Sequence, residues 1–448
     1  MIQGLSKPEA DEYEWLTGRL VGKRSRNLLR ASYMDGKHML RRLPPTAPPY
    51  LRDIKIVLGW PAKAVEMLAR RIRLEGFALP GGDIDQYDVP ALLDRTGYFA
   101  MVQQAQVSAL VHSTVFAIVH DQGRVSFVTA LDGTGRWDPA ERRFTSFLRV
   151  VEWDREKIRP KIAVLILPGR LITIEDGQAV SRVVTPSYVP VVQMPYKPRL
   201  DRPFGSSRIS RAVMSLTDSA VRTVLRSEGT ADFYGAPWFM IFGPDEEAFS
   251  KGSWQMIMDR VNAIPDNEDS PNPRADVKQF SQASQQPHVD QLQVLAGLFA
   301  GETNIPVSSL GVGIHQDNPT SAESYLASRE DMIAEAEDAQ ATWGWAHRQV
   351  ACWVWQAAHD GEQIPDELNN LVPVWRDARF TSRAAAADAA VKLVSVFPWM
   401  AQSETIVSRL GFDAETTSRL LAEKRRGEAL TSLQDLMGGT DSADNLDQ

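Results

Sequence analysis

The feature that most constrains this chain is a long amphipathic helical pattern between residues 320 and 359. Apolar side chains recur there at steps of three and four, which places them on one face of an α-helix. They are Tyr325, Met332, Ile333, Ala336, Trp343, Val350, Trp353, Val354 and Ala357. Thr320 and Glu323 have capping-box spacing, in which each side chain satisfies a backbone amide at the helix start. Unbroken to His359, the helix is expected to be about 60 Å long.

A helix of this length exceeds the diameter of a small domain, so its apolar face needs an extended partner. That partner is either the rest of an elongated monomer or neighbouring subunits of an assembly. A second apolar face with helical spacing follows residue 207. We therefore expect the chain to self-assemble, with packing contributed by Ile209, Val213, Leu216, Trp343 and Trp353.

An acidic flank accompanies the apolar stripe of the long helix. It consists of Glu330, Asp331, Glu335, Glu337 and Asp338. One interpretation of these carboxylates is that they act as acid/base pairs or as cation ligands. The other, which we favour, is a solvated or subunit-facing helix surface. Trp343, Trp345, Trp353 and Trp355 cover a wide arc of the same helix, which predicts burial on more than one side.

The first 200 residues favour an α+β region. Helical patterns cover residues 12–40, 61–74 and 89–110, and the period then changes. Short β-branched or aromatic runs follow at residues 115–119, 125–130, 147–151, 162–167 and 171–174, separated by turn residues. Pro168 and Gly169 predict a hairpin between the last two runs. We expect helices first and then a mainly antiparallel sheet.

Beyond the Pro-, Gly- and Arg-rich stretch 195–207, helices and a small β insert are expected. Helical patterns cover residues 209–226 and 288–300, and they flank two short candidate strands at 238–242 and 277–280. An irregular Gly-containing stretch, 305–319, leads to the long helix. Helical patterns at 382–396 and 414–427 and an acidic tail, 438–448, complete the chain.

Charge and cysteine content narrow the classes of function. The net charge of −8 argues against tight binding of nucleic acid, which normally uses clustered Lys and Arg. The basic helix at 12–40 is read as touching either DNA or acidic protein neighbours, and protein is favoured. The lone Cys352 forms no intrachain disulfide, and no secretory signal is seen, so folding in a reducing cytoplasm is expected. The longest apolar run, 162–168, is too short to span a membrane.

Searches for catalytic and cofactor signatures predict none. Cys352 lies in an aromatic helical stripe and is read as packing, and His347 and His359 are too far apart on their helix for a metal pair. Gly311 and Gly313 lack the rest of a nucleotide-binding fingerprint. We therefore expect no enzyme activity, no metal and no cofactor. An alternative is a cytoplasmic α+β enzyme with a site near His112, His120 and Asp121.

Four strings in one order carry a family resemblance. They are Arg202-Pro-Phe-Gly-Ser-Ser-Arg208, Asn304-Ile-Pro306 with Leu310-Gly311, Asn318-Pro-Thr-Ser-Ala-Glu323, and Trp375-Arg-Asp377 followed by residues 382–388. With the order of elements, they resemble the portal proteins of siphophages, in particular those of phages of actinobacteria. The likeness extends from about residue 12 to residue 427. A further alternative is another minor phage head structural protein.

The resemblance implies a portal fold with an α+β wing, a helical stem, a small β-containing clip, a long helix with a tunnel loop, and a short helical crown region. Its parts are the wing at 1–200, stem helix 1 at 201–234, the clip at 235–286, stem helix 2 at 287–303, the tunnel loop at 304–319, the long wing helix and return segment at 320–380, and the crown region with an acidic tail at 381–448. Because little chain follows residue 427, a large crown is not expected.

The resemblance also implies a function and partners. Twelve subunits would form a ring at the unique capsid vertex, through which double-stranded DNA is packaged and ejected. The terminase large subunit, the head-tail adaptor and the major capsid or scaffolding protein would bind it, in the host cytoplasm during assembly and then in the virion. The tunnel-loop residues expected to approach DNA are Ser308, Ser309, Gly311, Gly313, His315, Gln316, Asp317 and Asn318.

Overall fold

The computed structural model describes most of the chain as helices and antiparallel strands. The residues described are 2–40, 55–154, 159–235, 239–242, 271, 276–279, 284–312, 329–379 and 383–402, with single residues and short stretches between 406 and 430. They divide into a large unit, residues 1–375, and a small one, residues 376–448. The combination of helices and antiparallel strands confirms the predicted α+β class.

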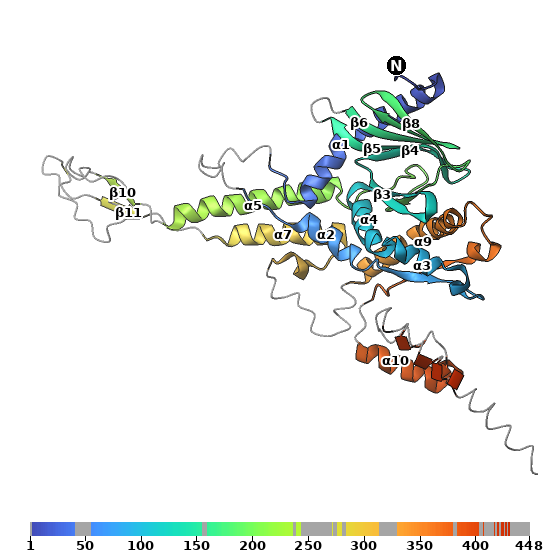
Figure 1. The fold of residues 1–448 in the computed structure, drawn as a ribbon. Helices are drawn as coiled ribbons and strands as arrows, with labels where there is room; N and C mark the ends of the chain where they lie inside the picture. Colours follow the sequence, from blue (N-terminus) through green and yellow to red (C-terminus); the bar gives the residue numbers. More distant parts are fainter. Residues whose placement is uncertain are drawn as a thin grey trace, which may run out of the picture. The chain divides into compact units, whose positions relative to one another are not determined.

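A five-stranded antiparallel sheet forms one layer of the large unit (Figure 1). Its strands in spatial order are β4 (Gly133–Asp138), β5 (Arg143–Asp154), β6 (Arg159–Leu167), β7 (Arg170–Glu175) and β8 (Gln178–Val184). The hairpin predicted at Pro168 and Gly169 joins β6 to β7, and Gly169 has the positive φ of 76° that such a tight turn requires. Helix α1 (Lys7–Met34) buries Tyr13 and Leu16 against this sheet.

A second sheet lies between the first sheet and the helices. Its order is β3 (Val125–Thr129), β2 (Thr114–Val119) and β9 (Val191–Pro195), and every residue of β2 and β9 is buried. Phe116 on β2 packs edge-on against Phe147 of β5 with ring centroids 4.9 Å apart. The buried cluster between the sheets therefore consists mainly of aromatic and β-branched side chains.

Short helices surround these sheets. They are α2 (Trp60–Ala69), η2 (Ile84–Tyr87), α3 (Val89–Arg95), α4 (Tyr98–His112) and η3 (Asp121–Gly123). The single helix predicted over 89–110 is wrong, because Gly97 interrupts it with a left-handed φ of 67° and separates α3 from α4. The first predicted helix also ends earlier than expected, at Met34 rather than near residue 40.

Helices α5 (Arg211–Gly235) and α7 (Gln286–Thr303) extend away from the sheets as an antiparallel pair (Figure 1). Polar contacts join them along their length. Ser210 Oγ donates to Glu302 Oε1 (2.9 Å), and Thr230 Oγ1 lies 3.2 Å from His288 Nε2. Strands β10 (Phe239–Phe242) and β11 (Asp276–Gln279) pair at the far end, which confirms the two predicted strands of the insert.

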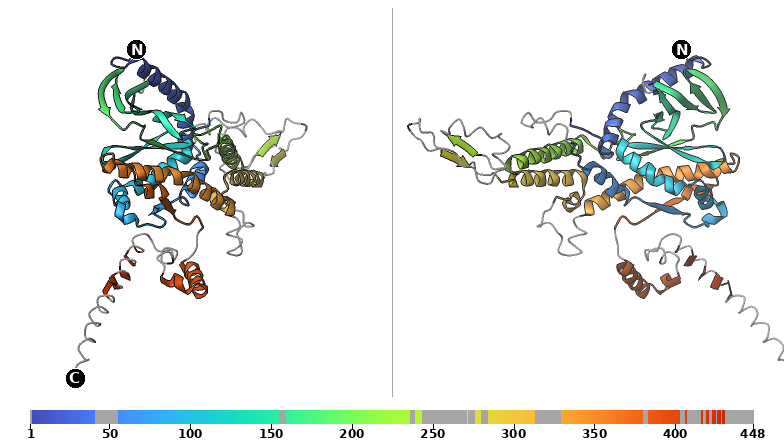
Figure 2. Two further views of the ribbon diagram at one scale, coloured as in Figure 1. Left: turned by 90° about the vertical axis from the view of Figure 1, so that its right-hand side faces the viewer. Right: turned by 60° about the vertical axis from the view of Figure 1, so that its left-hand side comes forward.

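Helix α9 (Glu330–Ala358) is the long helix of the sequence pattern. Its predicted capped start at Thr320 lies outside the described residues. After α9 come η6 (Asp366–Asn370) and β12 (Val372–Trp375), which pairs with β1 (Leu74–Ala78). Figure 2 shows α1 along the five-stranded sheet and α9 beside the three-stranded one. Every helix among the described residues is too short or too polar to cross a bilayer.

The small unit contains α10 (Arg383–Val396) and η7 (Pro398–Gln402). Helix α10 matches the pattern at 382–396. Most residues of the predicted helix at 414–427 lie outside the described part of the chain.

Candidate functional site

One buried arginine, Arg208, precedes α5 and holds the end of the α5–α7 pair that lies next to the sheets. Its side chain donates in three directions at once. Nε donates to the Ala64 carbonyl on α2 (2.7 Å), Nη2 to the Thr303 carbonyl at the end of α7 (2.5 Å), and Nη1 to Tyr196 Oη after β9 (3.1 Å). A planar guanidinium with five N–H groups suits this role, because it can satisfy several fixed acceptors in one plane.

The charge of Arg208 is balanced by Glu335 on α9, which is also only 6% exposed. The distance from Arg208 Nη1 to Glu335 Oε1 is 2.6 Å, and Lys197 Nζ lies 2.5 Å from the same oxygen. The Tyr196 hydroxyl also donates to this carboxylate. Burial raises the pKa of Glu335, but Arg208 and the hydrogen bonds outweigh it and bring the pKa to about 2. Glu335 therefore stays ionised at neutral pH.

Asn304 connects the end of α7 to the same carboxylate. It has a left-handed φ of 53°, and its backbone N–H donates to the Ala300 carbonyl, which ends the helix. Its side-chain amide Nδ2 donates to Glu335 Oε2 (3.2 Å). One carboxylate thus holds the linker before α5, the end of α7 and the start of α9. We call this set, Tyr196, Lys197, Arg208, Asn304 and Glu335, the junction cluster.

The structure explains why the segment Arg202 to Arg208 contains Phe204 and Gly205. Gly205 has φ of +70°, and a Cβ there would lie 2.2 Å from the Tyr196 carbonyl oxygen, so only glycine fits without displacing the backbone. Phe204 packs on the rings of Phe116 and Phe144, with centroids 6.3 and 6.1 Å away. The string therefore places Arg208 relative to the buried cluster between the sheets.

Sequence reasoning missed the role of Glu335. Its assignment to a solvated or subunit-facing flank is wrong, whereas Glu330, Asp331, Glu337 and Asp338 are exposed. A signal was present in the spacing, because Glu335 follows Met332 by three residues and precedes Ala339 by four. A carboxylate in register with an apolar stripe indicates a buried charge with a cationic partner.

The predicted tunnel-loop residues are described only in part. Ser308 and Ser309 lie in the short helix η5 (Val307–Leu310), and Gly311 ends it with φ of 74°. Ser308 and Gly311 are exposed. Gly313, His315, Gln316, Asp317 and Asn318 lie outside the described residues. Ile305 and Leu310 are buried, so the start of this stretch is anchored to the large unit.

The residues expected to pack between subunits fall into two groups. Ile209, Val213 and Trp343 are fully buried within the chain itself, and Trp343 Nε1 donates to the Pro195 carbonyl (2.8 Å). In this arrangement they have no surface left for a neighbour. Leu216 and Trp353 are partly exposed and keep surface that a second copy can contact.

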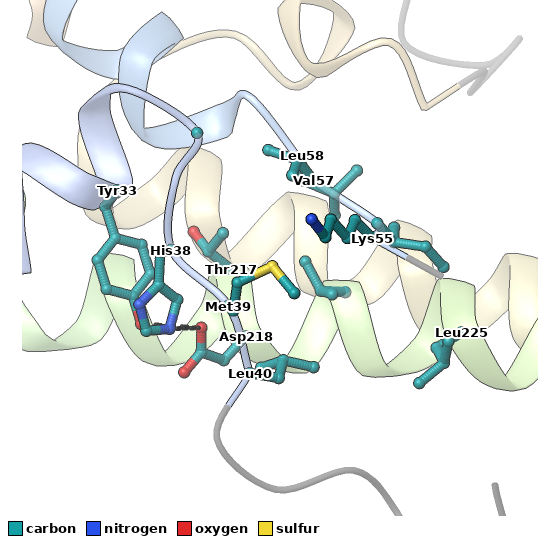
Figure 3. Close-up of a pocket in the computed structure, with 13 residues that line it drawn as sticks. Tyr33, His38, Met39, Leu40, Lys55, Val57, Leu58, Thr217, Asp218 and Leu225 are labelled. Carbon is teal, nitrogen blue, oxygen red and sulfur yellow. Dashed lines mark hydrogen bonds and ion pairs between the residues drawn. The ribbon is translucent and has the colours of Figure 1, made fainter. Parts of the chain in front are cut away.

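A small cavity of about 80 Å³ lies beside α5 (Figure 3). At one end Tyr33 Oη donates to Asp218 Oδ1 (2.8 Å), His38 Nε2 lies 3.4 Å from the same oxygen, and the two rings stack 4.0 Å apart. Leu225 and Val57 line the apolar remainder. These contacts fasten the residues after α1 to α5, and the volume is too small for a nucleotide or a comparable substrate.

The two histidines of the alternative enzyme site lie at opposite ends of strand β2. His112 ends α4 and His120 follows β2, so the six-residue strand separates them. His112 is buried, and burial together with Arg30 lowers its pKa to about 4. His120 shares a hydrogen bond with Ser126 Oγ (2.7 Å), a neighbour on the adjacent strand. Each histidine is thus explained by its local packing.

Comparison with known proteins gives a single family. The model for the phage portal protein family of the SPP1 Gp6-like type matches residues 22–427. The portal protein of Mycobacterium phage L5 is 27% identical over 387 residues, covering 81% of this chain and 77% of that protein. The portal protein of Mycobacterium phage D29 is 26% identical over 385 residues, with the same coverage.

Two solved structures are similar at lower identity. One is a chain from the neck of an empty gene transfer agent particle, with 14% identity and a TM-score of 0.44, covering 76% of this chain and 85% of that one. The other comes from the neck of the native particle computed with C12 symmetry, with 14% identity and a TM-score of 0.42, covering 86% of this chain and 98% of that one. Because the family model spans nearly the whole chain, this protein belongs to the SPP1 Gp6-like family of phage portal proteins.

Proposed function

We propose that this portal protein is a passive conduit, in which twelve copies close a ring at the unique capsid vertex and double-stranded DNA passes through the centre. The observation that carries the proposal is the arrangement around the antiparallel pair α5 and α7. A small strand pair lies at one end of it, and the junction cluster fixes the start of residues 304–319 at the other.

We assign the parts of the ring as the family resemblance implies. Residues 201–234 and 287–303 form the stem, residues 235–286 the clip, and residues 304–319 the tunnel loop. Residues 1–200 and 320–380 form the wing, and residues 381–448 form a small crown region with an acidic tail. Strands β10 and β11, within the clip, lie at the end of the α5–α7 pair away from the sheets (Figure 1), and we expect a partner outside the capsid to bind there.

The proposed partners are those that the family resemblance implies. The clip binds the terminase large subunit during packaging in the host cytoplasm and the head-tail adaptor in the finished virion. The wing contacts the major capsid or scaffolding protein. The terminase supplies the energy of DNA translocation, and the portal supplies the ring and its channel.

The charge of the chain suits sliding rather than holding. Duplex DNA carries about one negative charge per 1.7 Å, and a cationic lining would bind it in proportion to the number of phosphates contacted. The net charge of −8 opposes such binding. We expect weak affinity for free duplex that is lost at moderate salt.

Negative-stain imaging of the purified protein tests the ring. Rings with a central hole are expected, whereas a uniform monomer at all concentrations would contradict the proposal. Deleting residues 244–273 within the clip tests the terminase contact. Rings should persist and packaging should fail, and normal packaging by this variant would show that the clip is not the docking surface.

Replacement of residues 312–316 by a short Gly/Ser linker tests the tunnel loop. Rings should form, but less DNA should be packaged or retained. The matched control replaces the exposed hairpin residues 139–142, between β4 and β5, by the same linker and should leave packaging unchanged. Fully normal packaging by the 312–316 variant would show that this stretch is an ordinary connection.

A further inference from the structure

Helix α1 carries four cations on one face. Arg19, Lys23, Arg26 and Arg30 are spaced by four, three and four residues, which aligns them over three turns. In the part of the chain that the structure describes, none of them forms an ion pair with a carboxylate. By contrast, Arg24 on another face of the helix lies 3.4 Å from Asp132 Oδ1. We call the four residues the basic face of α1.

These cations repel one another within the subunit. Burial lowers the pKa of Lys23, and Arg19 and Arg26 lower it further. Burial also lowers the pKa of Arg30, to about 10, and Arg26 acts in the same direction. Within the subunit, Arg19 and Lys23 lie over the ring of Phe204 rather than beside a carboxylate. Among the described residues this row of like charges has no carboxylate partner, which in a chain of net charge −8 indicates a surface that an anionic partner completes.

Two glycines border the basic face. Gly18 and Gly22 lie one turn apart inside α1, both are exposed, and a Cβ on either would meet no atom within 4 Å. Each costs about 1 kcal/mol of helix stability relative to alanine. No contact among the described residues requires a glycine at either position. The two glycines suit the close approach of another helix backbone, because a helix without side chains there can be approached at short range.

A complementary face exists at the start of α9. Its exposed residues are Glu330, Asp331, Glu337 and Asp338, with the exposed alanines Ala334 and Ala341 between and after them. We call these carboxylates the acidic face of α9. Four carboxylates and small side chains over three turns match the four cations and two glycines of α1 in charge, in length and in the space left for close packing.

The two faces are separate within one subunit. Helix α1 packs against α4, α2 and the five-stranded sheet, whereas α9 packs mainly against η3, β9, α3, β12 and β2; both helices also contact α2 (Figures 1 and 2). Each subunit therefore offers one basic and one acidic face. Two different complementary faces on one chain make a head-to-tail contact, which closes into a ring when the rotation between subunits is right.

We propose that the basic face of α1 docks on the acidic face of α9 of the adjacent subunit in the ring. The proposal rests on the proposed function, since it names the contact that closes that ring. Duplex DNA is the other polyanion within reach of this family, but exposed glycines fit the approach of a helix and give no advantage in binding phosphates. The test below separates the two partners.

A charge swap is the first test. Lys23→Glu with Arg26→Glu should raise the protein concentration needed for half-maximal ring assembly by about a hundredfold, and Glu337→Lys with Asp338→Lys should have a similar effect. Combining all four changes should restore most of the assembly, because attraction replaces repulsion. The matched control reverses two cations on the five-stranded sheet, the exposed Arg143 and the partly exposed Lys161 (Arg143→Glu with Lys161→Glu), and should assemble as the wild type does.

Gly22→Ala is the second test, and it does not depend on charge. The monomer should melt at a higher temperature, because alanine favours the helix and the space is open. Ring assembly should nevertheless weaken by about tenfold, since the added methyl group separates the two helices. A stabilised monomer with weakened assembly cannot be explained by misfolding.

The outcomes distinguish this inference from the proposed function. If the wild type forms no rings by native mass spectrometry and imaging, the proposed function fails. If the wild type forms rings and the α1 reversal also forms them normally, or if the combined variant does not recover, the inference fails while the portal function stands. Intact rings with reduced DNA binding in the α1 reversal would likewise overturn it, in favour of a DNA surface.

Discussion

The two sheets and the junction cluster are both buried, but different interactions hold them together. Between the sheets, Phe116, Phe144 and Phe147 pack with ring centroids 4.9 to 5.8 Å apart. In the junction cluster, Arg208 and Glu335 are nearly as buried but are held by a salt bridge and hydrogen bonds. Apolar contacts do not depend on direction, whereas each salt bridge or hydrogen bond of the junction cluster joins two specific atoms.

The two regions contribute different things to the folded chain. Burying apolar surface stabilises the fold directly, about 25 cal/mol per Å². A buried ion pair contributes little net free energy, because desolvation offsets the attraction, yet losing one partner is costly. The sheets therefore supply stability, and the junction cluster fixes where α7 ends and α9 begins.

The largest effect is expected for Glu335→Ala. It leaves the Arg208 charge buried without its carboxylate, and we expect a loss of about 3–5 kcal/mol in the free energy of unfolding. Guanidinium titration at one fixed protein concentration measures it. The double variant Arg208→Leu with Glu335→Leu should lose less than the single one, because it buries no unpaired charge. A larger loss in the double variant would show that the pair is a net source of stability.

Leu165→Ala on β6 should cost about 3 kcal/mol, because it leaves a cavity in a fully buried position of the sheet. Below its melting temperature the variant should still form rings that retain DNA as the wild type does. Glu335→Gln, at a comparable loss of stability, should retain less. Equal retention by the two variants would mean that the junction cluster has no role beyond stability.

The response to acid should also separate the regions. The pKa of Glu335 in the folded chain, about 2, is below its ordinary value of 4.5. The stability it confers is therefore complete above pH 4.5 and is lost as the pH falls towards 2. At pH 3.5 the wild type should have lost about 1.5 kcal/mol of this contribution, and Glu335→Gln should lack that part of the decline. Parallel pH profiles of the two proteins would contradict the assignment.

The smallest effect is expected for Asn304→Gly. Asn304→Gly keeps a residue that tolerates the left-handed φ of 53° but removes the 3.2 Å hydrogen bond to Glu335, at a cost of about 1 kcal/mol. Asn304→Ala should cost about 1 kcal/mol more, because alanine is strained in that conformation. Urea titrations of both variants measure separately the free energy of the lost hydrogen bond and that of the backbone strain. Equal values for the two would mean that the backbone conformation changes in the variants.

The sequence predicted the parts whose signal is local. Runs of β-branched residues located β2, β3, β5, β6 and β7, the turn at Gly169 joined the last two, and helical spacing located α5 and α7. The edge strand β8 escaped because nearly all of its residues are exposed, so no alternation of polar and apolar residues marks it. Strand β12 escaped because its partner β1 lies about 300 residues earlier.

The junction cluster could not be assembled from sequence for a related reason. Periodicity shows which side of a helix is buried, but it does not show against what. Arg208, Asn304 and Glu335 come from three segments, and their meeting depends on the placement of α5, α7 and α9 together. The strings that carried the family resemblance contained Arg208 and Asn304 without revealing that both contact one carboxylate.

The single cysteine has a practical consequence for labelling. Cys352 is buried on α9, and its thiol donates to the Leu368 carbonyl (3.4 Å). Burial raises the pKa of this thiol to about 11, so at neutral pH almost none of it is the reactive thiolate. A cysteine introduced on any exposed position would then be the only fast-reacting thiol in the chain. Fluorophores and cross-linkers can be placed one per subunit in the otherwise natural sequence.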